Sequence, residues 1–169
     1  FASDLSAQHV ASLVPLAGTV LEIGAGRGTK TSLMQARALE ELGHPTLIHT
    51  VDIHEFKAHL LSQRMEQMGI PGVTTHVGDA TDLDAIADLQ RAFDAVFIDA
   101  PCSGTGTLRR HPEIRWRIDP RDIESLTQVQ AQMLQSAASY VRAGGTLVYA
   151  TCSVLDSEND ALVEAFLNT

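Results

Sequence analysis

The sequence of 169 residues contains only two cysteines, so it lacks the sulfur density of a disulfide-stabilised secreted fold. It has no apolar run of roughly 18 residues, the length that a membrane-spanning helix needs. Its first residues lack the basic and then apolar pattern of a signal peptide. Basic residues are also in deficit, because the formal net charge is −9. These absences predict a cytoplasmic protein without a membrane partner, and they count against nucleic-acid binding by charge alone.

The composition is that of an ordinary globular protein. Hydrophobic residues make up 44% of the chain and charged residues 20%. The length suits a single domain over residues 1–169 with a sizeable core. Because the chain begins with Phe1 rather than Met, we expect it to be a piece of a longer protein.

Short runs rich in Val, Ile, Leu and Thr alternate with amphipathic segments along the chain. This alternation predicts an α/β fold, with a mostly parallel sheet that helices cover on both faces. Right-handed crossovers and one chain reversal after the third strand predict the strand order 3-2-1-4-5. The expected strands are Thr19–Ile23, Thr46–Asp52, Val73–Val77, Ala95–Asp99 and Thr146–Thr151.

Helix boundaries are marked by glycine, proline and capping residues. Glycine follows two of the amphipathic segments, and an Asp-Pro pair is typical of the start of a third. The expected helices are Lys30–Leu42, Glu55–Met68, one from Asp119-Pro120 to Gly144-Gly145, and one capped by Ser157 that runs to about Leu167.

Ligands of parallel sheets bind beyond the carboxyl ends of the strands, so the residues there are the first site candidates. A glycine-rich loop, Gly24–Lys30, follows the first strand and permits close approach of the backbone to a ligand. Asp52 follows the second strand, where a carboxylate can accept both hydroxyls of a ribose, and Asp79 follows the third strand. Each feature alone is also compatible with a plain turn or a capping residue.

The two cysteines both follow predicted strands that are neighbours in the sheet. Cys102 stands in Asp99-Ala-Pro-Cys-Ser-Gly after the fourth strand, and Cys152 stands in Thr-Cys-Ser after the fifth. A free cysteine is often only a small buried hydrophobe, and a disulfide between the two is a further alternative. Two thiols on the ligand side of a sheet favour a nucleophilic role instead.

The two cysteine segments resemble motifs IV and VI of the Nop2/Sun (RsmB/RsmF, Fmu-like) RNA 5-methylcytosine methyltransferases. Val20–Thr31 aligns without gaps to the family's V-L-D-x-C-A-A-P-G-G-K-T, although the proline is replaced by Arg27. Leu108–Trp116 and Phe1–Ser12 are similar to other segments of the family, so the resemblance covers essentially the whole chain. It implies a Rossmann-like class I methyltransferase fold, with two further strands expected beyond Thr169.

The resemblance also implies S-adenosylmethionine as the cofactor and no metal. Asp52 corresponds to the ribose contact and Asp79 to the adenine contact, and Lys30 is expected to steady the loop or the cofactor carboxylate. The role of Arg27 stays open between a ligand contact and a solvated tip. The expected cofactor-binding residues are Gly24, Ala25, Gly26, Arg27, Gly28, Thr29, Lys30, Asp52, Asp79 and Asp99.

Catalytic roles follow from the same resemblance. Cys152 corresponds to the nucleophile that adds to carbon 6 of cytosine, and Cys102 to a cysteine thought to assist product release. Asp99 is expected to hydrogen-bond the base. Cysteine chemistry alone does not choose between the two thiols, because DNA cytosine methyltransferases use the cysteine of a Pro-Cys pair.

The implied partner is RNA, with ribosomal RNA as the first candidate and transfer RNA as the second. Leu108–Arg121 holds five arginines and a local charge balance of +3, and Trp116 within it suits base stacking, a core position or a lid. Most RNA affinity is expected from domains outside this chain. Two alternatives remain: a catalytically silent cofactor-binding module in RNA or ribosome assembly, and a nicotinamide dehydrogenase, which leaves the cysteine motifs unexplained.

Overall fold

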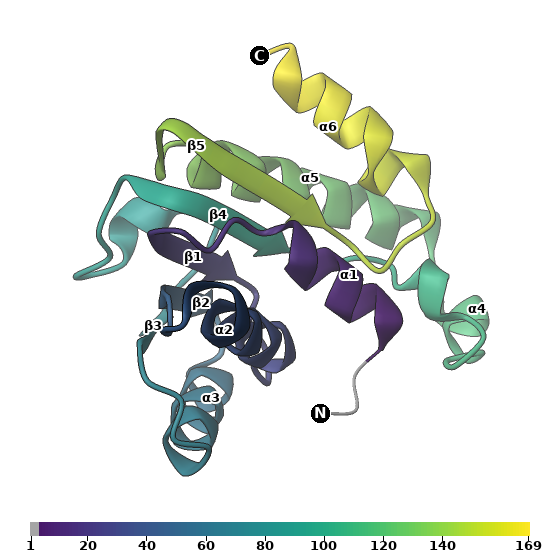
Figure 1. Cartoon of the computed structure of the whole chain (residues 1–169). Coiled ribbons are helices and arrows are strands. Elements are labelled where there is room, and N and C mark those ends of the chain that lie inside the picture. The colour runs from purple at the N-terminus through teal and green to yellow at the C-terminus, as the bar shows by residue number, and fades with distance from the viewer. Residues whose placement is uncertain (1–3) are drawn as a thin grey trace.

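The computed structural model describes residues 4–169, and its centre is a five-stranded sheet (Figure 1). The strand order is β3-β2-β1-β4-β5, and the four pairings of neighbouring strands are all parallel. The predicted order is therefore confirmed. The strands are β1 (Thr19–Ile23), β2 (Leu47–Asp52), β3 (Val73–Val77), β4 (Phe93–Asp99) and β5 (Val141–Ala150).

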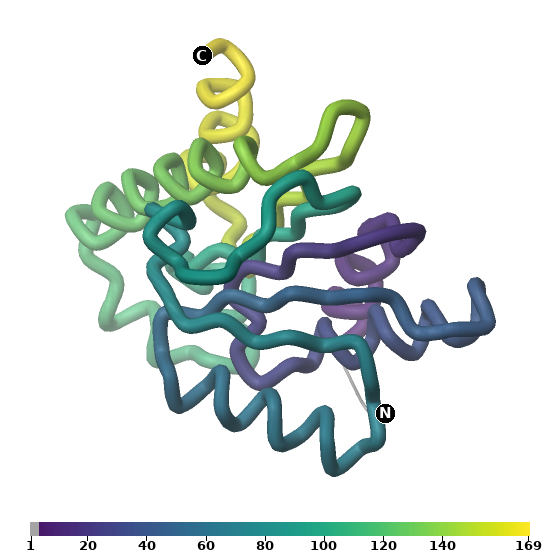
Figure 2. The backbone as a smooth tube through the Cα atoms, turned by 90° about the vertical axis from the view of Figure 1, so that its left-hand side faces the viewer, coloured from purple at the N-terminus to yellow at the C-terminus, as the bar shows by residue number. Residues whose placement is uncertain are grey.

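Helices cover both faces of the sheet, as the sequence predicts. On one face α1 and α2 pack against the sheet, and α3 runs beside β2 and β3 (Figure 2). On the other face α5 and α6 pack against β1, β4 and β5. The helices are α1 (Leu5–Leu13), α2 (Thr29–Leu42), α3 (Glu55–Gln67), α4 (Ile114–Arg117), α5 (Pro120–Ala138) and α6 (Asp160–Leu167), with 3-10 turns η1 (Leu83–Ala85), η2 (Thr105–Thr107) and η3 (Asp156–Glu158).

The central strands are buried on both sides, which explains their nearly continuous apolar sequence. In β1, Val20 belongs to the core under α1 and α2, whereas Leu21 belongs to the core under α5. Phe97 and Ile98 divide between the same two cores in β4. Within residues 4–169, no helix combines the length and the apolar character that crossing a bilayer requires.

The boundary between α5 and β5 differs from the prediction. We expected the helix to reach Gly144-Gly145, but it ends at Ala138 and β5 already begins at Val141. The carbonyl of Tyr140 accepts a hydrogen bond from the Phe93 N–H at 2.8 Å, which starts the ladder to β4. Gly144 has a φ of +74°, and the register shifts between Phe93 and Ala95. The two glycines therefore mark an irregularity inside a strand rather than a helix stop.

The segment after β5 also differs from the prediction. Ser157 does not cap the last helix, because it lies inside η3 and α6 begins only at Asp160. Asn159 separates the two with a non-helical backbone, φ −130° and ψ −105°. Its side chain accepts from the Thr151 hydroxyl at 2.7 Å and donates to the carbonyls of Ser153 and Leu155. The residues on either side of Cys152 are held in place by this one side chain.

The loops that follow the strands begin at one edge of the sheet. Backbone hydrogen bonds continue the ladder beyond the strand ends, from Gly24 N–H to the Val51 carbonyl and from Gly78 N–H to the Asp52 carbonyl. Ala100 N–H donates in the same way to the Ala150 carbonyl at 2.9 Å. The glycine loop, the two predicted carboxylates and both cysteines therefore share this edge.

Candidate functional site

Two hollows open at the carboxyl edge of the sheet. We call the first the glycine-loop hollow: it has a volume of about 400 Å³ and is lined by residues that follow β1, β2, β3 and β4. The second, the cysteine hollow, has a volume of about 340 Å³ and lies between α1, Lys30 and the residues that follow β4 and β5. Asp99 and Cys152 line both hollows. A molecule in either hollow would therefore reach the same two side chains.

The glycine loop brings backbone close to neighbouring elements. Gly24 has a φ of +82°, and a Cβ there would lie 2.4 Å from the Asp99 carbonyl oxygen. Gly28 has a φ of +75°, and a Cβ there would lie 2.1 Å from the Leu61 side chain of α3. Glycine is therefore required at both positions, because a side chain would meet either backbone or a packed helix.

The two predicted carboxylates lie in the glycine-loop hollow. Asp52 accepts hydrogen bonds from the backbone N–H of Gly26 at 3.3 Å and of His54 at 2.9 Å. Asp79 accepts from the backbone N–H of Thr81 at 2.9 Å, so it both caps a turn and faces the hollow. A carboxylate oxygen offers two acceptor sites, so both groups keep capacity for ligand hydroxyl or amino groups.

The ten predicted cofactor residues differ in whether they line a hollow. Arg27 is exposed, and its carbonyl accepts from the Arg64 guanidinium at 2.8 Å, which places it at the outer tip of the loop. The residues that line only the glycine-loop hollow are Gly24, Gly26, Asp52 and Asp79, whereas Lys30 lines only the cysteine hollow and Asp99 lines both. The residues that line neither hollow are Ala25, Arg27, Gly28 and Thr29.

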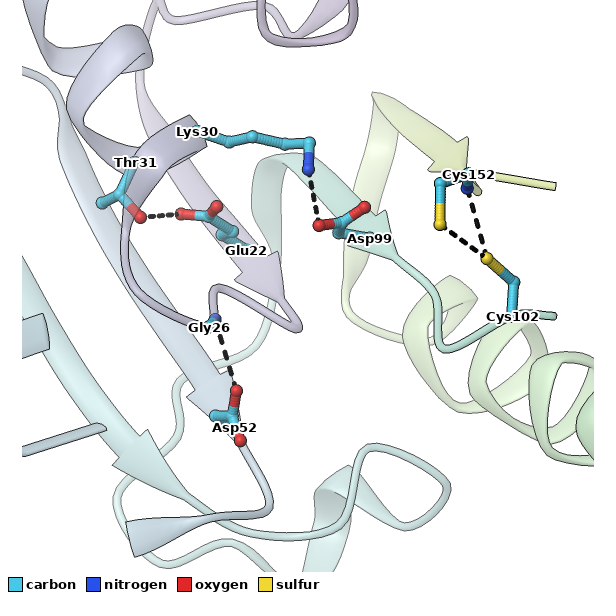
Figure 3. A network of polar contacts seen from close by, with 8 residues as sticks. All are labelled: Glu22, Gly26, Lys30, Thr31, Asp52, Asp99, Cys102 and Cys152. Atoms are coloured by element: carbon cyan, nitrogen blue, oxygen red, sulfur yellow. Dashed lines mark hydrogen bonds and ion pairs between the residues drawn. The ribbon is translucent and has the colours of Figure 1, made fainter. Parts of the chain in front are cut away.

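An ion pair stands between the two hollows (Figure 3). The Lys30 ammonium, on the first turn of α2, lies 2.6 Å from an Asp99 carboxylate oxygen at the end of β4. Both side chains are partly exposed, at 21% and 32%. The pair holds the Asp99 carboxylate at the junction, where it can accept hydrogen bonds from a ligand in either hollow.

The two thiols lie side by side, as the sequence predicts for neighbouring strand ends (Figure 3). The Sγ atoms of Cys102 and Cys152 are 3.1 Å apart, and the Cys152 N–H donates to the Cys102 sulfur at 3.3 Å. Cys152 is exposed and Cys102 is half-buried, and both are free thiols. The sequence alternative of small buried hydrophobes is therefore wrong for Cys152.

The surroundings shift the pKa values of the two thiols in opposite directions. The hydrogen bond from Cys102 lowers the pKa of the Cys152 thiol to about 6, against opposing effects of burial and of the Asp99 charge. The same hydrogen bond, together with burial, raises the pKa of Cys102 well above its ordinary range. Cys152 is therefore the more acidic of the two thiols and the one that forms a thiolate more readily, and the thiolate is the nucleophilic form.

Sequence reasoning missed two fully buried carboxyl groups, Glu22 and Glu158. Glu22 lies in β1 and accepts from the Thr31 hydroxyl at 2.6 Å (Figure 3). Glu158 lies in η3 and accepts from the Ser103 backbone at 2.9 Å and from Gln130 at 3.1 Å. An acidic residue inside the apolar β1 run is a signal that could have found Glu22. The sequence near Glu158 is polar and carries no such signal.

The arginine-rich segment forms one rim of the site. Arg110 lines the cysteine hollow and makes an ion pair with Asp4 of the segment before α1. Trp116, on α4, is 86% exposed, which excludes the core position that the sequence left open. Among residues 4–169, no three His, Cys, Asp or Glu side chains are grouped so that they could hold a metal ion.

Comparisons with known proteins agree with this geometry. Ribosomal RNA small subunit methyltransferase B of Escherichia coli O6:K15:H31 is 38% identical over 166 residues, which make up 97% of this chain and 37% of that protein. The protein of the same name from Photorhabdus laumondii is 36% identical over an equal span. The chain thus spans little more than a third of the length of these relatives.

Solved structures share the arrangement of strands and helices. The structure described as PH0851 superposes with a TM-score of 0.87 at 29% identity, covering 99% of this chain and 37% of that one. NSun6 from Pyrococcus horikoshii with SFG superposes with a TM-score of 0.84 at 22% identity, covering 99% and 42% respectively, and bears on the fold alone.

A family model described as 16S rRNA methyltransferase RsmB/F matches residues 13–169, which include the glycine loop, Lys30, Asp99 and both cysteines. This match confirms the resemblance that the two cysteine segments carry. The chain belongs to the RsmB/F family of 16S rRNA methyltransferases.

Proposed function

We propose that the protein transfers a methyl group from S-adenosylmethionine to carbon 5 of cytosine in RNA. The observation that carries the proposal is the pair of thiols 3.1 Å apart, with the exposed and acidic Cys152 at the junction of two hollows. The curated relatives are named as methyltransferases of small-subunit ribosomal RNA. Ribosomal RNA is therefore the first substrate to test, and transfer RNA the second.

The glycine-loop hollow fits S-adenosylmethionine. Its volume of about 400 Å³ lies in the ordinary range for small-ligand sites. At Gly24, a Cβ would fill the cradle beside Asp99, and Asp52 and Asp79 present carboxylates to hydroxyl and amino groups. When bound, the cofactor supplies an electrophilic methyl group. Gly24, Gly26, Asp52 and Asp79 would hold it with that group directed toward the junction.

The chemistry of cytosine explains why a thiolate is needed, because carbon 5 alone is a weak nucleophile. The Cys152 sulfur forms a bond to carbon 6, which raises the electron density at carbon 5. Carbon 5 then takes the methyl group from the sulfonium, which leaves as a neutral thioether. The proton on carbon 5 passes to solvent, the double bond between carbons 5 and 6 reforms, and the bond from carbon 6 to the Cys152 sulfur breaks, which releases the product and the thiolate. Asp99 accepts a hydrogen bond from the base, and Lys30 steadies its charge. Cys102 assists the release.

The cysteine hollow is the place for the target base. A base inside a stem must leave its stack to reach it, and a base in a single strand can enter directly. Arg110 lies at the rim, and the exposed Trp116 offers a flat surface for a neighbouring base. We propose that the remaining RNA contacts come from segments like those by which the relatives exceed this chain in length.

A covalent trap tests the reaction and assigns the cysteines. Full-length protein is mixed with S-adenosylmethionine and 5-fluorocytidine RNA, in which fluorine replaces the proton that must leave. We expect a methylated protein–RNA adduct with the wild type and with Cys102→Ala, and none with Cys152→Ala. An adduct lost only in Cys102→Ala would reverse the roles of the two cysteines. Cofactor binding without any adduct would favour a silent module in RNA or ribosome assembly.

A further inference from the structure

One carboxylate lies directly beneath the two cysteine loops. Glu158 is 0% exposed, and its oxygens accept hydrogen bonds from the Ser103 N–H at 2.9 Å, the Ser103 hydroxyl and the Gln130 amide at 3.1 Å. Burial alone would raise the pKa of Glu158, but hydrogen bonds from Ser103, Ser153 and Gln130 hold it below its ordinary value. An ionised carboxylate is rarely buried completely, and here its partners offset the cost of desolvation.

The contacts of Glu158 join three segments that are far apart in the sequence. Gln130 of α5 also donates to the Pro101 carbonyl at 2.8 Å, next to Cys102. The Ser103 hydroxyl lies 3.2 Å from the Ser153 hydroxyl, next to Cys152. The loop after β4, the middle of α5 and the loop after β5 therefore converge on one buried charge.

The position of Cys102 governs the acidity of Cys152. Three groups that act on the Cys152 thiol are Cys102, Asp99 and Lys30, and the hydrogen bond from Cys102 has the largest effect. Asp99 and Lys30 make their ion pair with each other, on β4 and α2. Ser103, the residue after Cys102, is the one that Glu158 binds twice. A shift of the Ser103 loop would separate the two sulfurs and leave the Lys30–Asp99 pair in place.

We propose that Glu158 is a positioning residue whose buried carboxylate holds the Cys102 loop against Cys152 and so makes the Cys152 thiol reactive. The proposal deepens the proposed function, on which its catalytic meaning rests. It differs from a purely structural role, because it requires that thiol chemistry at Cys152 change when the carboxylate is removed.

The test uses the full-length protein with Glu158→Gln and Ser103→Ala, and Glu164→Gln as the matched control on the exposed side of α6. The rate of Cys152 alkylation by iodoacetamide is measured between about pH 5 and 9 by mass spectrometry of the Cys152 peptide. We expect the wild type to follow a thiol pKa near 6. In Glu158→Gln the profile should move toward an ordinary thiol near pH 8.5, so the rate at about pH 6.5 falls roughly tenfold or more. Ser103→Ala should shift it less, and Glu164→Gln not at all.

A second readout reports the distance between the sulfurs. With oxidised glutathione, the Cys102 and Cys152 thiols form a disulfide, and their two protons and electrons convert one glutathione disulfide into two glutathione thiols. The equilibrium constant rises with the proximity of the two thiols. We expect it to fall about fivefold or more in Glu158→Gln, as the effective concentration of Cys102 at Cys152 falls.

Thermal unfolding separates the two roles. The proposal would be overturned if Glu158→Gln melted at a lower temperature but kept the wild-type alkylation profile and glutathione equilibrium, since Glu158 would then support only the fold. If Glu158→Gln does not fold, Ser103→Ala decides by the same criteria. Neither the alkylation rate nor the glutathione equilibrium requires RNA. A missing fluorocytidine adduct would therefore refute the proposed function, and these two measurements would still decide whether Glu158 positions the thiols.

Discussion

Glu22 is a residue whose burial conflicts with its charge. It lies 0% exposed in β1, with one oxygen bonded to Thr31 and the other, Oε1, without a hydrogen-bond partner among the described residues. Desolvation raises the pKa of Glu22 from 4.5 to about 7. Below about pH 4.5 Glu22 carries the proton in both the folded and the unfolded chain, so its burial as a charge does not lower the free energy of unfolding there.

The raised pKa of Glu22 predicts a stability that falls as pH rises. Between about pH 4.5 and 7 the unfolded chain gives up its proton before the folded chain, so the free energy of unfolding decreases. Glu22→Gln cannot ionise and should remove this fall, a gain of up to about 3 kcal/mol at pH 8 relative to pH 4.5. Urea denaturation at both pH values measures it, with the exposed Glu164→Gln as control. Parallel curves for Glu22→Gln and wild type would contradict the prediction.

At the scale of the element, the glycine loop is the connection that sets the shape of the glycine-loop hollow. Gly24 and Gly43 have similar positive φ angles, +82° and +73°, but their surroundings differ. A Cβ at Gly43 would meet nothing within 4 Å, whereas a Cβ at Gly24 would meet the Asp99 carbonyl. The two positions separate backbone strain from close approach.

Substituting alanine at these two glycines should have unequal effects. Gly43→Ala should lower the free energy of unfolding by about 1 kcal/mol, because only the left-handed backbone is strained there. Gly24→Ala should introduce the same backbone strain and also push β1 away from Asp99. It should therefore lower the free energy of unfolding further and weaken the binding of S-adenosylmethionine. Denaturation and titration calorimetry measure the two effects. Equal stability losses with unchanged affinity in both variants would refute the close-approach explanation.

Sequence pattern predicted the elements well where the local signal and the tertiary environment agree. Thr19–Ile23 has the predicted bounds, because a buried parallel strand requires the apolar run that identifies it. Val73–Val77 also has the predicted bounds, although it is a partly exposed edge strand in which β-branched Val and Thr residues carry the signal. Tyr140 and Val141 fit the helical spacing of α5 yet leave it, because pairing with Phe93 is a contact between distant residues. No local pattern contains that pairing.

The candidate site was predicted to the level of its strand ends and no further. Cys102 and Cys152 were expected to be neighbours because parallel strand ends meet, and the structure confirms it. The contacts of Glu158 with Ser103 and Gln130 join residues 28 or more positions apart, so sequence spacing cannot indicate them. The expected roles of the remaining cofactor residues stay predictions.

At the scale of the whole molecule, the charge is acidic overall and basic in one place. The net charge is −9, whereas Leu108–Arg121 carries five arginines. Arg110 and Arg121 are engaged by Asp4 and Asp119. Arg115 on α4 is exposed and, within residues 4–169, has no ion pair, so it is the arginine we choose for a phosphate contact.

Removing one such charge should change the salt dependence of RNA binding. In the full-length protein, Arg115→Gln should reduce the slope of log affinity against log salt concentration by about 1, because one phosphate contact is lost. Arg142→Gln is the control, since Arg142 lies at the start of β5, away from the carboxyl ends of the strands where the site lies, and pairs with Asp94. Filter binding over a salt series measures both. An unchanged slope for Arg115→Gln would remove α4 from the RNA path.

Asp99 and Cys152 form a wall common to both hollows, so the occupants of the two hollows would act on the same two side chains. A positive sulfonium in the glycine-loop hollow would favour the thiolate form of Cys152, which is the form that a base in the cysteine hollow would meet. The occupants of the two hollows are then linked thermodynamically. By reciprocity, the factor by which an occupant of one hollow would strengthen binding in the other hollow applies equally in the reverse direction. Loss of the sulfonium charge on methyl transfer would remove this coupling, so formation of the product would itself weaken binding in both hollows.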